Sequence, residues 1–156
     1  MIKIITAVTQ EHYSTAAKLF NDYAIALGID LSFQNFEKEL KDLPLQYGAP
    51  KGRLLLAYHN DKAIGCVGVR ALDHHISELK RMYIKPEGRG LGLGTILLKA
   101  SLQAAEELGY SYVRLDTLPE MKAAIHLYES HGFYLIKPYR YNPMENALFY
   151  EKQLNK

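Results

Sequence analysis

The sequence predicts a mixed α/β fold in which helices cover the faces of one sheet. Short apolar runs with strand character alternate along the chain with longer segments whose apolar residues recur at helical spacing. A glycine-rich segment joins the end of one apolar run to the start of a helical segment. The length of 156 residues suits one domain, and a hydrophobic content of 48% is enough for a core. We therefore expect residues 1–156 to form a single domain.

The first third of the chain carries start and stop signals for a strand and two helices. Residues 2–8 have the pattern of a strand, and Thr9 is a suitable N-cap for the helical pattern that follows it and ends at Gly28. Ser32 is a candidate cap for a second helix. The segment 43–52 holds two prolines and two glycines, so we expect a loop there.

The middle of the chain predicts a hairpin and a third strand. The apolar runs 53–59 and 63–71 are joined by Asn60-Asp61, which is typical of a tight hairpin turn. The next strand begins at the pair His74-His75 and is stopped by Pro86. The later elements expected are a helix from the glycines to Gly109, a strand at 112–115, a helix from Pro119 to Gly132, and strands at 133–136 and 147–153.

The glycine-rich segment is the strongest local signal for a ligand. Four glycines fall within seven residues directly before a helix, with Arg89 inside the segment and Lys85 just before it. Glycine lets backbone approach a ligand, and the free N–H groups of a helix N-terminus attract anions. We therefore expect a phosphate-binding turn, and an ordinary tight turn is the alternative. The glycines are Gly88, Gly90, Gly92 and Gly94.

This segment does not fit the two common nucleotide-binding motifs. A P-loop needs Lys after its last glycine, whereas Gly94 is followed by Thr95-Ile96. The dinucleotide motif needs its third glycine one residue later than Gly94. A nucleotide-binding protein therefore remains only the third choice.

Two segments together resemble a known family. The segment 89–94, Arg-Gly-Leu-Gly-Leu-Gly, is similar to the Arg/Gln-x-x-Gly-x-Gly/Ala turn of the GNAT superfamily of N-acetyltransferases, and 124–133 resembles its A-x-x-L-Y-x-x-x-G-F segment. The order and the separation of the two also match that superfamily. The resemblance covers about residues 53–154 and implies a mixed, mostly antiparallel central sheet of about six or seven strands flanked by about four helices.

The resemblance also implies acetyl-CoA as the cosubstrate, with its pyrophosphate on the glycine turn and its pantetheine arm along the preceding strand. Many family members carry Asn at the position of Met121, so either another group makes that contact, with Thr117 as the candidate, or the contact is absent. The implied pyrophosphate residues are Arg89, Gly90, Leu91, Gly92, Leu93, Gly94 and Thr95, and those for the arm are Met82, Tyr83 and Ile84.

Two residues are candidates for proton transfer. Tyr128 matches the family tyrosine near the thioester sulfur and would act as the acid, although a tyrosine on an apolar helix face also suits a core. Glu78 begins the strand that leads to the glycine turn and is the candidate base. A water chain is an alternative base, and the alternative side chains are His74, His75, Glu120 and Asp116.

The expected reaction is direct transfer of an acetyl group to the primary amine of a small-molecule or amino-acid-like acceptor. The region 21–52 and the loop before the last strand would form the acceptor site. Arg70 or Arg140 would hold an acceptor carboxylate, and a structural surface role for either arginine is the alternative. An acyl-CoA-binding or regulatory module without efficient catalysis is the alternative. Polar and aromatic candidates for this site are Tyr47, Tyr139, Arg140, Tyr141 and Asn142.

Composition narrows the other possibilities. A net charge of +2 gives no reason to expect nucleic-acid binding, and no apolar run approaches the length of a membrane span. The single cysteine, Cys66, allows no internal disulfide, suits a reducing compartment, and is expected to be a small buried residue rather than a nucleophile. The six histidines lack metal-ligand spacing, so we expect no metal. We expect a cytoplasmic monomer or homodimer that binds neither nucleic acid nor membrane.

Overall fold

The computed structural model describes residues 1–28, 36–142, 144 and 146–154. These residues form one seven-stranded sheet in the order β1-β2-β3-β4-β5-β7-β6. Every neighbouring pair is antiparallel except β4 and β5, which are parallel. The expected mixed, mostly antiparallel sheet is thus confirmed. The strands are β1 (Ile2–Thr6), β2 (Arg53–His59), β3 (Lys62–Ala71), β4 (Ile76–Ile84), β5 (Tyr112–Thr117), β6 (Tyr134–Ile136) and β7 (Leu148–Gln153).

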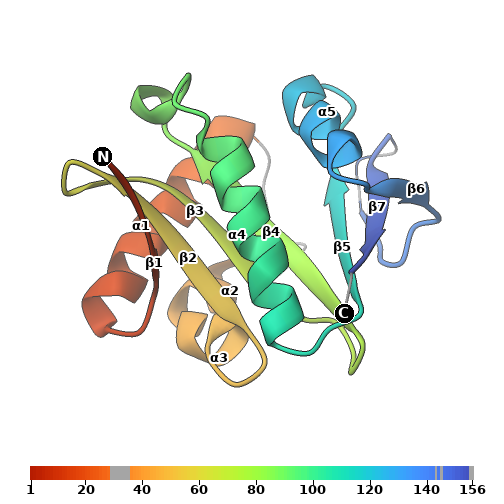
Figure 1. Cartoon of the computed structure of the whole chain (residues 1–156), viewed down its shortest axis with the longest axis horizontal. Coiled ribbons are helices and arrows are strands. Elements are labelled where there is room, and N and C mark those ends of the chain that lie inside the picture. Colours follow the sequence, from red (N-terminus) through yellow and green to blue (C-terminus); the bar gives the residue numbers. More distant parts are fainter. Residues whose placement is uncertain (29–35, 143, 145, 155–156) are drawn as a thin grey trace.

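Helices cover both faces of the sheet (Figure 1). Helices α1, α2 and α3 pack on one face around Phe20, Leu54 and Leu56. Helices α4 and α5 pack on the other face around Leu97 and Leu115. No helix of the described residues is both long enough and apolar enough to cross a membrane. The helices are α1 (Gln10–Leu27), α2 (Phe36–Lys41), α3 (Leu43–Tyr47), α4 (Leu93–Glu107), α5 (Lys122–Ser130) and a short 3₁₀ helix η2 (Pro86–Gly88).

Local side-chain chemistry explains several element boundaries. The Thr9 hydroxyl accepts a hydrogen bond from the His12 backbone N–H at 3.0 Å, and the His12 ring accepts one from the Thr9 N–H, so Thr9 caps α1 as expected. Gly28 ends α1 with a φ of 65°. Asn60 and Asp61 both have positive φ, which is the geometry of the expected hairpin turn.

The loop expected at 43–52 is wrong for its first half, which forms α3. Pro44 lies in the first turn of α3, where its missing N–H removes no helical hydrogen bond. Leu43 and Tyr47, one helical turn apart, are both buried, and this burial stabilises the short helix. Ser32 lies outside the described residues.

Two other boundaries are shifted from the sequence-based expectation. β4 begins at Ile76 rather than at His74, because the Asp73 carboxylate holds the backbone N–H groups of His75 and Ile76 in a turn. α5 begins at Lys122, three residues after Pro119.

A β-bulge at Arg81 interrupts β4. Gly68 of β3 pairs with Lys80 and Cys66 pairs with Tyr83, so Arg81 and Met82 together oppose the single residue Val67. Arg81 has a φ of 59°, which is a conformation that non-glycine residues rarely adopt. A bulge increases the local bend and twist of its strand. β4 therefore changes direction at Arg81.

A buried ion pair holds Arg81 in this conformation. The Arg81 side chain is 3% exposed and donates to both carboxylate oxygens of Glu39 on α2, at 3.0 and 2.8 Å. The Tyr47 hydroxyl donates to Glu39 Oε2 at 2.8 Å. Two parallel guanidinium–carboxylate bonds fix orientation as well as charge. The pair thereby ties α2 and α3 to the bulge.

The bend separates the two central strands. β4 and β5 pair only from Ile76 to Glu78, opposite Tyr112 to Arg114. Beyond Glu78 the parallel pairing stops, although β4 continues to Ile84 and β5 to Thr117. Figure 1 shows β4 and β5 adjacent near the C-terminus of the chain and apart near the start of α4. The sheet is thus forked at its centre.

Replacing Glu39 with Gln is expected to destabilise the protein by about 3 kcal/mol or more, because it leaves the buried Arg81 charge without a full counter-charge. The matched control is Glu107→Gln, which removes an exposed ion pair with Arg53 and is expected to cost under about 1 kcal/mol. Urea unfolding measures both differences. A cost for Glu39→Gln no larger than that of the control would contradict the bulge-stabilising role.

The same pair predicts a pH dependence of stability. Burial raises the pKa of Glu39, but the hydrogen bonds and charge of Arg81 outweigh it and leave the pKa below its usual value of 4.5. A lowered folded-state pKa adds stability that is present above pH 4.5 and is lost as the pH falls through the folded-state pKa. The stability advantage of wild type over Glu39→Gln should therefore shrink below that pH, in urea unfolding measured across acidic buffers.

Candidate active site

A cavity of about 1300 Å³ lies in the fork. Its walls come from four regions that are far apart in the sequence: the end of α1, the second half of β4, the start of α4, and α5 with the segment before it. The lining residues include Tyr23, Leu27, Met82, Tyr83, Ile84, Gly88, Arg89, Gly90, Gly92, Leu93, Gly94, Thr95, Glu120, Met121, Ala124, His126, Leu127 and Met144.

The N-terminus of α4 points its free amides into this cavity region. Gly92 is the N-cap with a φ of 74°, and the first helical hydrogen bond runs from Ile96 N–H to the Gly92 carbonyl at 3.2 Å. The N–H groups of the residues between them have no partner within the helix. No acidic residue lies in the first turn, and Arg89 lines the cavity beside it. The arrangement favours an anionic ligand.

Glycine is needed at these four positions for two different structural reasons. Gly90 and Gly92 have φ values of 82° and 74° and border open space. Gly88 and Gly94 have ordinary backbone angles but lie in tight contacts: a Cβ on Gly94 would lie 3.3 Å from Leu127 of α5. The first pair shapes the turn, and the second lets η2, α4 and α5 pack closely.

The free edge of β4 forms one wall. Tyr83 and Ile84 pair with Cys66 and Gly65 of β3 on one side. On the other side, β5 has diverged, so this part of β4 has no strand neighbour there among the described residues. Unpaired backbone groups of a strand edge bind extended chains that carry amides.

Nine of the eleven residues expected to bind the cosubstrate line the cavity. The two exceptions are Leu91, which is 40% exposed, and Thr117, which is 8% exposed. The Thr117 hydroxyl contacts Met121 Sδ at 3.6 Å, and Met121 itself lines the cavity.

Tyr128 of α5 lies in the core beside the fork. It is 6% exposed, and its ring packs against Phe133 at a centroid distance of 5.6 Å. Burial raises the pKa of Tyr128, and the nearby Tyr23 and Asp116 raise it further, so the phenol stays protonated at neutral pH. Among the described residues, none forms a hydrogen bond with its hydroxyl. The hydroxyl is therefore available to a ligand.

Glu78 is fully buried and engaged on both oxygens. Oε1 accepts from Arg70 at 3.1 Å, and Oε2 accepts from the Tyr139 hydroxyl at 2.6 Å and from Arg140. Burial raises its pKa, but the charges of Lys80, Arg140 and Arg70 outweigh burial and lower it. A carboxylate with these partners is a weak proton acceptor.

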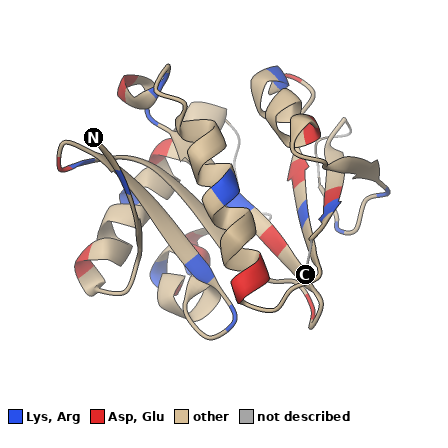
Figure 2. Cartoon of the chain, in the orientation of Figure 1, with Lys and Arg blue, Asp and Glu red and all other residues tan. Residues whose placement is uncertain are grey.

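A layer of charged groups lies on the same face of the sheet as Glu78. Arg114 pairs with Glu151 at 2.7 Å between β5 and β7, and Asp116 accepts from Asn142 at 3.2 Å. Lys80 is 3% exposed. Figure 2 shows acidic and basic residues on the central strands themselves, not only on the outer helices. Such a layer suits the recognition of a polar acceptor.

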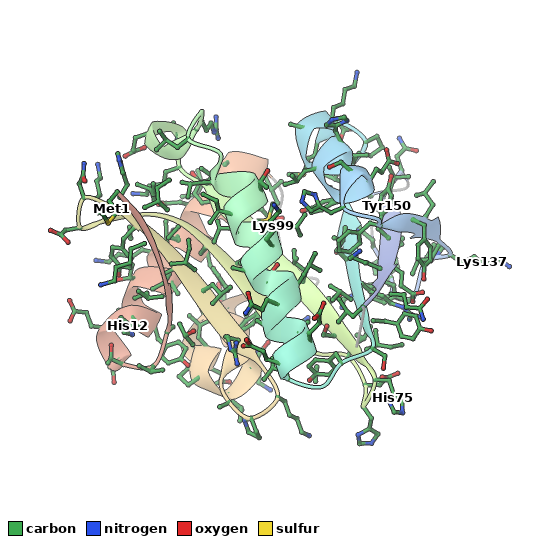
Figure 3. All side chains as sticks on the ribbon, viewed as in Figure 1. Met1, His12, His75, Lys99, Lys137 and Tyr150 are labelled. Atoms are coloured by element: carbon green, nitrogen blue, oxygen red, sulfur yellow. The ribbon has the colours of Figure 1, made fainter. Side chains whose placement is uncertain are left out.

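The alternative base candidates separate into two groups. His74 and His75 are exposed in the turn between β3 and β4, and Figure 3 shows His75 at the end of the molecule away from the start of α4. Glu120 lines the cavity, and Asp116 lies on β5 at the fork. Within the described residues, no three His, Cys, Asp or Glu side chains gather as metal ligands do.

The residues expected at the acceptor site fall into two groups, which differ in whether they contact the central strands. Tyr139, Arg140 and Asn142 reach across to Glu78 and Asp116, whereas Tyr141 is 76% exposed. Tyr47 was expected in a pocket-forming loop, and this is wrong, because it lies fully buried on α3 with its hydroxyl on Glu39.

Cys66 is fully buried, as expected. Its thiol contacts the Arg81 carbonyl at 3.3 Å, and burial raises its pKa, which keeps it a thiol. This disfavours a role as a nucleophile.

Sequence reasoning placed the end of α1 only in the acceptor region 21–52, and it missed one side of α5. Tyr23 and Leu27 of α1 line the same cavity as the residues expected to bind the cosubstrate. His126 and Leu127 line it from α5, with Ser130 one turn later. The helical spacing of this polar stripe was the signal that could have found them.

Comparison with known proteins identifies a family of similar sequence and similar fold. Residues 16–133 match the model of the acetyltransferase (GNAT) family. A Schizosaccharomyces pombe N-acetyltransferase is 40% identical over 140 residues, which cover 88% of this chain and 86% of that protein. An acetyltransferase structure from Streptococcus agalactiae aligns with a TM-score of 0.82 at 22% identity over 98% of both chains. A GNAT family acetyltransferase from Elizabethkingia anophelis, solved with acetyl-CoA bound, aligns with a TM-score of 0.65 at 20% identity over 98% of both chains.

The forked sheet, the glycine turn at the start of α4 and the matches in sequence agree on one assignment. The chain belongs to the GNAT family of acetyltransferases and is an acyltransferase.

Proposed function

We propose that the protein, acting as one domain over residues 1–156, transfers the acetyl group of acetyl-CoA directly to a primary amine of a small-molecule or amino-acid-like acceptor. The observation that carries the proposal is the cavity in the fork, which joins an anion-binding helix terminus to a free strand edge and a buried tyrosine. Family membership supports acetyl transfer, and the related structure with acetyl-CoA supports the donor.

The residues present fit the chemical parts of acetyl-CoA in order. The amides of Leu93, Gly94 and Thr95 and the Arg89 side chain suit the pyrophosphate. The free edge of β4 at Met82 to Ile84 suits the amides of the pantetheine arm. Acetyl-CoA would supply the activated acyl group.

Tyr128 is the proposed acid. Its phenol is protonated, buried and free of partners among the described residues, so it can donate to the sulfur as the thiolate leaves. Glu78, the expected base, can accept a proton only after Tyr139 and Arg140 move off its carboxylate.

The acceptor is proposed to lie on the charged face between β4 and the loop that carries Tyr139 and Arg140. An acceptor carboxylate would bind Arg140 rather than Arg70. Among the described residues, the buried Arg140 Nε has no hydrogen-bond partner, whereas Arg70 is held by both Glu78 and Gln46. This favours an amino-acid-like acceptor over a simple alkylamine.

Acetyl-CoA and CoA, but not NAD or ATP, are expected to stabilise the protein against heat. A ligand at about 100 times its Kd adds about 2.7 kcal/mol to the free energy of unfolding, or roughly 5–11 °C in Tm for a chain of this size.

The change to test is Gly92→Ala, and the matched control is Gly109→Ala. Both glycines have positive φ and border open space, but only Gly92 lines the cavity.

Both alanine variants should lose about 1 kcal/mol through backbone strain, and only Gly92→Ala should lose most of the CoA-induced shift in differential scanning fluorimetry. No shift of the wild type with CoA would contradict the donor site. Equal CoA-induced shifts in Tm for the two variants would show that the glycine turn is not part of the donor site.

Tyr128→Phe is expected to lower kcat by about 10²-fold while leaving the CoA-induced shift in Tm unchanged, because the hydroxyl acts on the leaving sulfur and not on the rest of the donor. Tyr150→Phe is the control, since Tyr150 is buried in the same core and its hydroxyl donates to Glu129 at 2.8 Å. A screen of primary amines with a thiol-release assay measures the rates. Equal rates for wild type and Tyr128→Phe would exclude the acid role.

A further inference from the structure

We propose that Tyr23 of α1 holds the amine group of the acceptor, through a hydrogen bond from the amine N–H to the Tyr23 hydroxyl oxygen. The proposal rests on the proposed function, since it adds a contact for the nitrogen that receives the acetyl group. The observation that carries it is a tyrosine that lines the cavity in the fork and whose hydroxyl has no hydrogen bond among the described residues.

Tyr23 lies on the face of the sheet opposite α4 and α5. Its ring packs in the cluster of α1, α2 and α3, and it contacts the ring of Tyr83 edge-on at a centroid distance of 6.1 Å. Met82 and Ile84, the neighbours of Tyr83 on β4, pack in the cluster on the other face. Since successive residues of a strand point to opposite faces, Tyr23 and Tyr83 together form the cavity wall on the α1 face.

The Tyr23 hydroxyl is open to the cavity. Among the described residues, Arg140 Nε is the one buried side-chain nitrogen or oxygen without a hydrogen bond. The Tyr23 hydroxyl has no hydrogen bond among these residues either, so its oxygen is not fully enclosed by protein. Because Tyr23 lines the cavity, a ligand in the fork can reach this oxygen.

The charges around the fork also act on this hydroxyl. Burial raises the pKa of Tyr23 to about 12, the charge of Arg81 lowers it, and the charge of Asp116 raises it. Glu39 neutralises Arg81 through two hydrogen bonds. Tyr23 is therefore a neutral phenol at pH 7 with a carboxylate in its surroundings. A phenol oxygen accepts hydrogen bonds, and a nearby negative charge favours a cationic donor such as an ammonium group.

Hydrogen bonds connect Asp116 to the same cavity. Asp116 follows Leu115 on β5, and Leu115 packs with α4 and α5, so the Asp116 carboxylate points to the α1 face. Asn142 donates to that carboxylate at 3.2 Å, and the Met144 backbone N–H donates to the Asn142 side chain at 2.9 Å. Met144 lines the cavity. The loop proposed for the acceptor thus joins Asp116 to the cavity that Tyr23 lines.

Tyr23 and Tyr128 approach the fork from opposite faces of the sheet. Tyr128 belongs to α5 and to the cluster on the other face. Burial raises the pKa of Tyr128, and Tyr23 is the next group that raises it, so the two phenols lie near each other. Side chains from opposite faces can approach in this way where the sheet is open, and β4 and β5 are unpaired beyond Glu78. An amine at Tyr23 would therefore lie opposite the proposed acid.

This placement suits the geometry of direct transfer. The lone pair of the amine nitrogen must point at the acyl carbon, about 3–3.5 Å away. The N–H bonds then point away from that carbon, and the Tyr23 oxygen accepts from one of them. The nitrogen–carbon bond forms and the carbon–sulfur bond breaks. One proton of the ammonium goes to the base, another reaches the sulfur through Tyr128, and Tyr23 keeps its own proton.

Tyr83, the other tyrosine of this wall, is placed for a different contact. Burial and the charge of Asp22 raise the pKa of Tyr83, and the charge of Arg89 lowers it. Arg89 belongs to the glycine turn, so the Tyr83 hydroxyl lies toward the donor side. Of the two tyrosines, Tyr23 is therefore the one suited to the acceptor.

The test compares Tyr23→Phe with Tyr13→Phe. Both tyrosines lie on α1, and neither hydroxyl has a hydrogen bond among the described residues. Tyr23 lines the cavity in the fork, whereas Tyr13 lines the second cavity, beside Thr6 and Pro44. Phenylalanine at 23 keeps the ring contact with Tyr83 and removes only the hydroxyl. Both variants should unfold close to the Tm of the wild type and keep its acetyl-CoA-induced shift.

Kinetics separate a contact with the acceptor from a structural role. In a thiol-release assay with free L-amino acids and n-alkylamines as acceptors, Tyr23→Phe should lower kcat/KM for the amine by about 10- to 10²-fold, which is the effect of one hydrogen bond to a charged group. The KM for acetyl-CoA should stay as in the wild type. Tyr13→Phe should match the wild type in both quantities. An unchanged kcat/KM for the amine in Tyr23→Phe overturns the proposal.

Two conjugates of CoA test the contact without a known acceptor. In CoA–S–CH₂–CO–NH–CH₂–COO⁻ the amide N–H represents the acceptor nitrogen after transfer, and in CoA–S–CH₂–CO–CH₂–CH₂–COO⁻ a methylene replaces it. Isothermal titration calorimetry of the wild type should show about 3- to 10-fold tighter binding of the amide, the effect of one neutral hydrogen bond. Tyr13→Phe should keep this preference, and Tyr23→Phe should lose it.

The same titrations separate this proposal from the proposed function. An amide preference that survives in Tyr23→Phe, or that is absent from the wild type, overturns the proposal, while binding of CoA itself still supports the donor site. Failure of CoA and of both conjugates to bind the wild type would contradict the proposed function, and the role of Tyr23 would fall with it.

Discussion

The structure depends on one buried ion pair, between Glu39 of α2 and Arg81 of β4. Arg81 has a backbone conformation that costs energy for a residue with a side chain. The bidentate contact with Glu39 stabilises Arg81 in this conformation and offsets that cost. The Tyr47 hydroxyl donates a further hydrogen bond to Glu39. The bulge that results bends β4 away from β5 after Glu78, and this bend makes room for a ligand between two strands that would otherwise pair.

The two sides of the fork present different chemical groups. On the side proposed for the donor, β4 offers a backbone edge that β5 does not pair with, and α4 offers N–H groups without a partner in the helix. Recognition there would rely on main-chain groups and on glycines at 90 and 92. On the side proposed for the acceptor, the strands offer side chains that are mostly charged and paired. In the proposed function, donor and acceptor therefore bind different parts of the same two strands.

The sequence predicted those features that depend on neighbouring residues. The cap at Thr9, the hairpin at Asn60 and the turn at Gly92 each follow from local backbone chemistry, and the structure contains all three. It did not predict the bulge, because the partners Glu39 and Arg81 are 42 residues apart. For the same reason it presented Glu78 as a free base, whereas Tyr139 and Arg140, 61 and 62 residues away, hold its carboxylate. Helix α3 was missed because Pro44 signals a loop unless its place in the first turn is known.

Hydrogen–deuterium exchange with and without acetyl-CoA tests most directly the claim that the fork is the donor site. The account predicts slower exchange at residues 82–84 of β4 and at residues 93–95 of α4, with little change in β1 and β2. Protection confined to other segments, such as those around the second cavity between Thr6, Tyr13 and Pro44, would contradict it. So would acetyl-CoA binding that leaves the amides of β4 and α4 unchanged.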